Sequence, residues 1–148
     1  MGSMRASPTL GIIWNDQMDD FSTPGVPNTF GFAPSETNFI KPGKRPMSSM
    51  SPMVIYNKTN NEVVMAVGAS GGSFIISATA QAVIRTILFN QTVKEAVDAP
   101  RLHNQYLPHV TQYERQMPKV LKFLDDPERQ GYQDTGQQGN WVWVTSIG

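Results

Sequence analysis

A glycine-rich segment, residues 68–73 (GASGGS), separates a run of apolar residues from an amphipathic stretch. The apolar run, residues 63–67 (VVMAV), has the length of a β-strand. The stretch after the glycines carries apolar side chains at the spacing i, i+3, i+4, i+7 and i+8, namely Ala80, Val83, Ile84, Ile87 and Leu88. This pattern predicts a strand, a glycine-rich turn and a helix.

The predicted turn has two interpretations. Glycines allow backbone N–H groups to converge closely on a ligand, and the N-terminus of a helix favours negative charge. Residues 68–73 are therefore a candidate binding segment for a carboxylate, a phosphate or a developing oxyanion. The same residues could instead form only a tight connection that needs positive φ angles.

The composition narrows the class of protein. The chain has 148 residues, of which 39% are hydrophobic, and this suits one domain with a sizeable core. We expect an irregular N-terminal segment over residues 1–10, whose first four residues resemble an expression remnant, and a single domain over residues 11–148. The charges balance at 12 basic and 12 acidic residues, with no basic patch, so nucleic acid and anionic membranes are not expected partners.

Targeting and metal-binding signals are equally sparse. No apolar stretch approaches the roughly 20 residues of a transmembrane helix, and no apolar region typical of a signal peptide follows Met1. Without cysteine the chain has neither disulfides nor a thiolate metal site. His103 and His109 lie six residues apart, which is a poor spacing for a metal pair, and we interpret both as structural or surface histidines.

Local patterns predict several further elements. Residues 11–14 favour a short strand, and the proline-rich residues 22–52 favour a long irregular segment. Residues 53–57 and 62–67 predict a hairpin whose second strand is apolar on both faces, as in a sheet covered on both sides. A helix is expected from about residue 76 to 89. Thr92 and Glu95 have the spacing of a capping box that opens a short helix before Pro100. A third helix near Pro118 and a final strand over residues 141–147 are also predicted, and the apolar end of the chain suggests truncation.

Three more segments could carry chemistry. Residues 15–22 (NDQMDDFS) contain three carboxylates and two amides, which could hold an ammonium group or could form only a solvated turn. A metal loop is a rival interpretation, but the EF-hand pattern is lacking. Residues 45–50 (RPMSSM) present two hydroxyls that could bind a carboxylate, although paired serines are common in loops. Residues 100–105 (PRLHNQ) follow a helix end, and we interpret them as structural.

In their order along the chain, five motifs resemble the small subunit of the γ-glutamyltransferase (glutathione hydrolase) family. They are NDQMDDF at 15–21, NFIKPGKRP at 38–46, MSSMSP at 47–52, GASGG at 68–72 and DAPRLHNQ at 98–105. The resemblance covers residue 11 to the end of the chain. It implies an α+β fold that forms part of an N-terminal-nucleophile hydrolase αββα sandwich, shared between a large and a small subunit.

The resemblance also implies an activity and its partners. In this family the N-terminal threonine of the small subunit attacks the γ-glutamyl amide of glutathione, and the acyl group passes to water or to an amino acid or dipeptide. The implied partners are glutathione, other γ-glutamyl compounds and the large subunit of the same precursor. No metal or organic cofactor is implied. The implied location is extracellular, at the cell surface or periplasmic, and no direct insertion into a membrane is expected.

Individual site residues follow from the same motifs. Gln17 and Asp20 match the positions that bind the α-ammonium group of the substrate. Ser48 and Ser49 match the pair that holds the α-carboxylate. Gly71 and Gly72 match the residues whose N–H groups form the oxyanion hole, in agreement with the strand, turn and helix predicted there.

The sequence also departs from the family pattern. In the family, the threonine nucleophile and a nearby strand motif lie well upstream of the segment that corresponds to residue 11, and neither is found here. Thr9 is at the wrong position to be the nucleophile. We therefore expect these 148 residues to carry much of the γ-glutamyl pocket without the nucleophile, and to be inactive alone. The alternatives are a non-catalytic protein, similar to the small subunit, that binds a γ-glutamyl ligand or a partner subunit, and an unrelated binding module.

Overall fold

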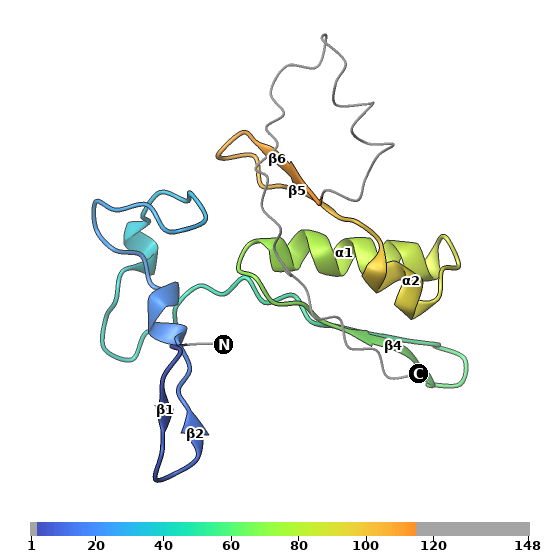
Figure 1. Ribbon diagram of the computed structural model, residues 1–148, viewed down its shortest axis with the longest axis horizontal. Helices are drawn as coiled ribbons and strands as arrows, with labels where there is room; N and C mark the ends of the chain where they lie inside the picture. Colours follow the sequence, from blue (N-terminus) through green and yellow to red (C-terminus); the bar gives the residue numbers. More distant parts are fainter. Residues whose placement is uncertain (1–2, 115–148) are drawn as a thin grey trace. The chain divides into compact units, whose positions relative to one another are not determined.

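The computed structural model describes residues 3–114 (Figure 1). The chain divides into two compact units, Met1–Ser48 and Ser49–Gly148, each of which is described by itself. The division into residues 1–10 and 11–148 stays a prediction. The predicted helix near Pro118 and the predicted strand over residues 141–147 lie outside the described residues.

The first unit is built largely of turns. Strands β1 (Ala6–Ser7) and β2 (Ile12–Ile13) form a short antiparallel pair, which confirms the strand predicted within residues 11–14. Two 3₁₀ helices follow, η1 (Gln17–Asp20) and η2 (Glu36–Asn38). Up to residue 52 the remaining chain forms turns and two isolated bridges, Ser22 with Phe39 and Thr23 with Val26. The irregular segment predicted for this region is confirmed.

The second unit begins with the predicted hairpin. Strands β3 (Met53–Tyr56) and β4 (Val63–Val67) pair antiparallel, with Met53 opposite Val67. At the turn, the N–H of Asn57 donates to the carbonyl of Glu62 over 2.9 Å. Alternation along β4 buries Met65 and Val67, whereas Val64 keeps 52% of its surface exposed. Within the described part of the chain, β4 is thus covered on one face only.

Helix α1 (Phe74–Ile87) follows the glycines directly. It begins two residues earlier than the sequence predicts, because the carbonyls of Gly71 and Gly72 accept hydrogen bonds from Phe74 and Ile75 at the first turn. The helix ends two residues earlier than predicted, before Asn90, which adopts the left-handed φ of 52° that typically terminates a helix.

The core of the second unit lies between α1 and the hairpin. Met65 and Val67 of β4 pack with Ala82 of α1, and Ile55 and Val83 cover this cluster. On its other side α1 contacts β5 (Leu102–Asn104). Figure 1 shows α1 (green) between the hairpin and the strand pair β5–β6. The helix is therefore the central element of this unit.

Helix α2 (Val93–Asp98) connects α1 to the second strand pair. The predicted capping box is confirmed: Thr92 Oγ1 accepts from the N–H of Glu95 over 3.2 Å, and the Glu95 carboxylate accepts from the N–H of Thr92 over 2.8 Å. Strands β5 and β6 (Thr111–Tyr113) pair antiparallel, and the sequence did not predict them. No helix within residues 3–114 is long and apolar enough to cross a bilayer.

Candidate functional site

The acidic segment of the first unit forms the 3₁₀ helix η1. Asn15 Oδ1 accepts from the N–H of Gln17 over 3.0 Å, and this Asx turn starts the helix that carries both Gln17 and Asp20. Both side chains are exposed. Although the Asp20 carboxyl is largely exposed, partial desolvation raises its pKa, and repulsion from the carboxylates of Asp16 and Asp19 adds to the rise. A cation bound at Asp20 would relieve this repulsion, so the segment suits an ammonium ligand.

The two serines predicted to hold a carboxylate lie outside helices and strands, where the first unit ends and the second begins along the chain. Ser48 is exposed and Ser49 is half-buried. The carbonyl of Ser49 accepts a hydrogen bond from Ser51 Oγ over 3.3 Å. Just before them, the N–H of Met47 donates to Asn38 Oδ1 over 2.9 Å, which ties this segment to η2 of the first unit. The residue before Ser48 is thus held by the side chain of Asn38, which lies 9 residues before Met47 in the sequence.

The glycine-rich turn has the backbone geometry that only glycine adopts readily. Gly71 has a φ of 124° and Gly72 a φ of 59°. Among residues 3–114, no acceptor receives the N–H group of either glycine. These two donors stand at the N-terminal end of α1, where the helix dipole favours negative charge. The arrangement can stabilise an anion or an oxyanion.

A stripe of polar side chains runs along α1 from this turn and binds the strand that follows α2. Its members recur every four residues, so they share one face of the helix: Ser73, Ser77, Gln81 and Arg85. Ser73 Oγ donates to Gln105 Oε1 over 2.7 Å. Ser77 Oγ lies 2.8 Å from His103 Nδ1. The first half of the stripe therefore holds the C-terminal end of β5 beside the glycine turn.

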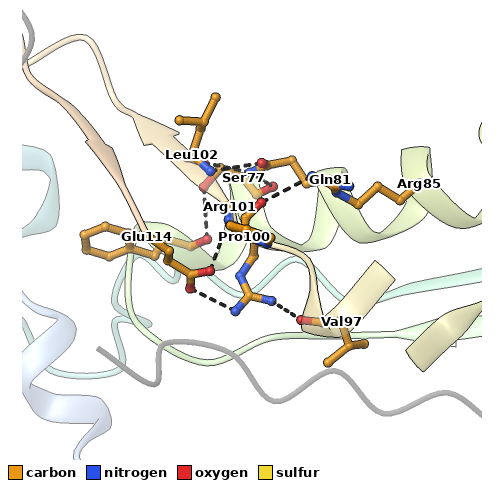
Figure 2. A network of polar contacts seen from close by, with 9 residues as sticks. Ser77, Gln81, Arg85, Val97, Pro100, Arg101, Leu102 and Glu114 are labelled. Carbon is orange, nitrogen blue, oxygen red and sulfur yellow. Dashed lines mark hydrogen bonds and ion pairs between the residues drawn. The ribbon is translucent and has the colours of Figure 1, made fainter. Parts of the chain in front are cut away.

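The second half of the stripe reaches the start of β5 (Figure 2). Gln81 bonds both backbone groups of Leu102. Arg85 donates from Nη2 to the carbonyl of Pro100 over 3.2 Å. The helix advances about 18 Å from Ser73 to Arg85, and the extended chain from Gln105 to Pro100 covers about 16.5 Å, so the two lengths match closely enough for these side chains to follow the strand.

Arg101 links the end of α2 to Glu114, the residue directly after β6, as Figure 2 shows. Its guanidinium donates to the carbonyl of Val97 over 2.7 Å and forms an ion pair with Glu114 at 2.9 Å. The bond to Val97 places a positive charge at the C-terminus of α2, as the sequence predicts. His103 is buried, and its ring packs against that of Phe74 with centroids 4.2 Å apart and planes tilted by 39°, whereas His109 is exposed. The structural interpretation of both histidines and of residues 100–105 is confirmed.

The sequence did not identify the polar stripe. Its signal was nevertheless present, because polar residues every four positions on an otherwise apolar helix indicate a face that binds other polar groups. Within residues 3–114, no group of three or more potential metal ligands comes together.

Solved structures first define the class of protein. The chain resembles a structure of Helicobacter pylori gamma-glutamyltranspeptidase with a TM-score of 0.75 and 34% identity, covering 99% of this chain and 84% of that one. A structure of gamma-glutamyltranspeptidase from Pseudomonas nitroreducens, complexed with L-DON, matches with a TM-score of 0.74 and 33% identity. The match covers 98% of this chain and 81% of that one. The fold is therefore the α+β fold of an N-terminal-nucleophile hydrolase, as the sequence predicts.

The family follows from the sequence comparisons. The family model described as Gamma-glutamyltranspeptidase matches residues 1–147. This chain belongs to the gamma-glutamyltranspeptidase family, which confirms the resemblance that the five motifs indicated.

Three further proteins are similar to this chain in sequence. Scoloptoxin SSD14 of Scolopendra dehaani is 49% identical over 120 residues, or 81% of this chain and 21% of that protein. Scoloptoxin SSD20 of the same organism is 47% identical over 120 residues, which are 81% of this chain and 60% of that protein. The glutathione hydrolase proenzyme of Arthroderma benhamiae is 46% identical over 80% of this chain and 20% of its own length. The chain thus spans from about a fifth to three fifths of these relatives.

Proposed function

We propose that this chain forms the γ-glutamyl-binding and oxyanion-binding part of a glutathione hydrolase or γ-glutamyltransferase. The observation that carries the proposal is the turn at Gly71 and Gly72, with positive φ angles at both and with no acceptor for their N–H groups among residues 3–114. Membership of the gamma-glutamyltranspeptidase family supports transfer or hydrolysis of a γ-glutamyl group as the reaction whose oxyanion this turn would stabilise.

In this proposal each group recognises one part of the substrate. The Asp20 carboxylate, with the Gln17 amide, receives the α-ammonium group by charge-assisted hydrogen bonds. Ser48 and Ser49 donate to the α-carboxylate. The carboxylates of Asp16 and Asp19 add negative potential at Asp20, and a cationic ligand there would offset it.

Catalysis requires a nucleophile as well. When a nucleophile adds to the γ-glutamyl amide, the carbonyl oxygen becomes an oxyanion, and the N–H groups of Gly71 and Gly72 would stabilise it. Removing one such donor typically lowers kcat by about 10²–10³. These 148 residues supply no activated nucleophile in the family position, so we expect them to bind a γ-glutamyl compound without cleaving it. Proteolytic self-processing, the large-subunit partner and an extracellular or periplasmic location belong to the same proposal.

The test compares binding with turnover. The protein of 148 residues is incubated with a γ-glutamyl anilide, and chromophore release is followed alongside binding of L-glutamate by NMR. We expect glutamate binding and no turnover. If turnover occurs, is abolished in Ser49→Ala and is accompanied by an acyl-serine in the mass spectrum, the assigned roles are wrong. If neither binding nor turnover occurs, even with the large subunit of a relative added, the γ-glutamyl pocket is absent.

A further inference from the structure

The least exposed residue between positions 3 and 48 is an asparagine. Asn38, at the end of η2, keeps 7% of its surface accessible, while its neighbours in this unit are half-buried or exposed. A polar side chain is costly to bury unless its hydrogen bonds are satisfied. The position of Asn38 therefore depends on the groups that it bonds.

Those bonds lead to two different segments. Asn38 Nδ2 donates to the backbone carbonyl of Asp20 over 2.8 Å and to Ser22 Oγ over 3.3 Å. Asn38 Oδ1 accepts from the backbone N–H of Met47 over 2.9 Å. Its backbone carbonyl also accepts from the N–H of Ser22 over 3.1 Å. One side chain thus connects the end of η1 to the residue before Ser48.

These two segments are the ones that the proposed function assigns to the two charged groups of one substrate carbon. The α-ammonium and α-carboxylate of a γ-glutamyl compound have a fixed separation, so the groups that bind them must also be held at a fixed separation. We propose that Asn38 is a positioning residue that aligns the Asp20 segment with the Ser48 segment. This inference rests on the proposed function, and it assigns a role to a residue that does not itself touch the substrate.

The chemistry of the asparagine side chain explains why this residue suits the position. The amide has both a donor and an acceptor, and the link uses each in a different direction. Leucine has a similar size and offers neither. Aspartate keeps an acceptor for the N–H of Met47, but it loses the donor to the carbonyl of Asp20 and adds a negative charge. A shift of about 1 Å in a binding group can lower activity about 10²-fold.

The experiment measures binding of three probes to the whole natural protein, including any segment beyond these 148 residues. L-Glutamate carries both charged groups, glutarate lacks the ammonium, and 4-aminobutyrate lacks the α-carboxylate. We expect Asn38→Leu to weaken L-glutamate binding by about 10- to 100-fold. The affinities for glutarate and for 4-aminobutyrate, each of which lacks one of the two α-groups, should change by less than about 3-fold. Asn38→Asp should fall between wild type and Asn38→Leu.

The matched control is Asn28→Leu. Asn28 Oδ1 accepts from the N–H groups of Phe30 and Phe32, both over 3.0 Å, in an exposed loop of the same unit. This variant also removes side-chain hydrogen bonds, but from a loop that does not join the two segments. It should leave the affinity for all three probes unchanged.

Amide hydrogen exchange gives a readout without ligand. The N–H of Met47 should exchange faster in both Asn38 variants than in wild type, and at the wild-type rate in Asn28→Leu. Equal weakening of all three probes, or an unchanged preference for L-glutamate in folded Asn38 variants, overturns the positioning role and leaves the proposed function intact. Unfolding of both Asn38 variants but not of Asn28→Leu likewise reduces the role to stability. Failure of wild type to bind L-glutamate overturns the proposed function itself.

Discussion

The side chain of Gln81 pairs with both backbone groups of Leu102, so a helix residue takes the place of a neighbouring strand. Gln81 Nε2 donates to the carbonyl of Leu102 over 2.7 Å, and the N–H of Leu102 donates to Gln81 Oε1 over 3.0 Å. β6 occupies the other edge of β5. This amide therefore satisfies strand groups that would otherwise form an open edge.

Replacing this amide should destabilise the second unit. Gln81→Ala leaves the N–H and the carbonyl of Leu102 without their partners, and we expect a loss of about 1–3 kcal/mol in the free energy of unfolding. Urea unfolding followed by circular dichroism measures it. Ile76→Ala, at a position of α1 that is 56% exposed, is the control and should change stability by about 0.5 kcal/mol or less. Equal effects of the two changes would contradict the role of Gln81.

The glycine turn should respond to substitution at one position and not at another. Gly71→Ala places a side chain at a φ of 124°, and we expect it to cost about 1–3 kcal/mol of stability and to lower kcat in the whole natural protein by displacing the oxyanion donors. Gly68 has open space around an added Cβ and no left-handed φ. Gly68→Ala should therefore be neutral or stabilise by up to about 1 kcal/mol. Thermal melts and steady-state kinetics test both, and a matching kcat loss in Gly68→Ala would argue against the turn as an oxyanion site.

The carboxylates of η1 should differ in function. In the whole natural protein, Asp20→Ala removes the proposed partner of the substrate ammonium, and we expect kcat/KM for a γ-glutamyl substrate to fall by about 30-fold to several thousand-fold, or roughly 2–5 kcal/mol. Asp16→Ala should change it by about 0.5 kcal/mol or less. Melting temperatures verify that both variants fold. Similar losses in two folded variants would mean that η1 does not present Asp20 to the substrate.

Asp20 should also link pH to stability and ligand binding. Its pKa in the folded state is raised, so its contribution to stability is present below the unfolded pKa and is lost as pH rises through the folded pKa. Asp20→Asn should therefore make the ligand-free protein less sensitive to pH in the range just above the ordinary aspartate pKa. An ammonium ligand favours the ionised carboxylate and should lower this pKa. NMR titration of the Asp20 side-chain carbon, with and without L-glutamate, measures both states, and a pKa that does not fall on binding would contradict an Asp20–ammonium contact.

The capping box of α2 should contribute to acid sensitivity with the opposite sign. Hydrogen bonds from the backbone and side chain of Thr92 lower the pKa of Glu95. The resulting stability is present above the unfolded pKa and is lost as pH falls through the lowered folded pKa. Thr92→Ala should cost about 1 kcal/mol at neutral pH and reduce the acid dependence of the melting temperature. Asp98→Asn, which removes the exposed ion pair with Lys94, is the control and should leave stability nearly unchanged. A full acid dependence retained in Thr92→Ala would refute the capping role.

The sequence predicted the elements whose causes are local. The apolar run that forms β4, the two glycines before α1 and the spacing of Thr92 and Glu95 each act within a few residues. Such signals depend on φ preferences, on side-chain period and on hydrogen bonds between near neighbours, all of which can be recognised without knowing what else packs nearby. The order of five short motifs likewise determined the family.

Tertiary structure decided the contacts between distant segments. β5 and β6 are three-residue strands without a strong apolar pattern, and they form because Gln81, 21 residues away, bonds Leu102 and because Arg101 pairs with Glu114. The link from Asp20 through Asn38 to Met47 spans 18 and then 9 residues. Residue types alone show that an asparagine can bond two backbone groups, but the choice of those groups depends on which loops meet in space. The sequence therefore determined the fold class and the candidate groups, whereas only the folded chain decided what holds those groups in position.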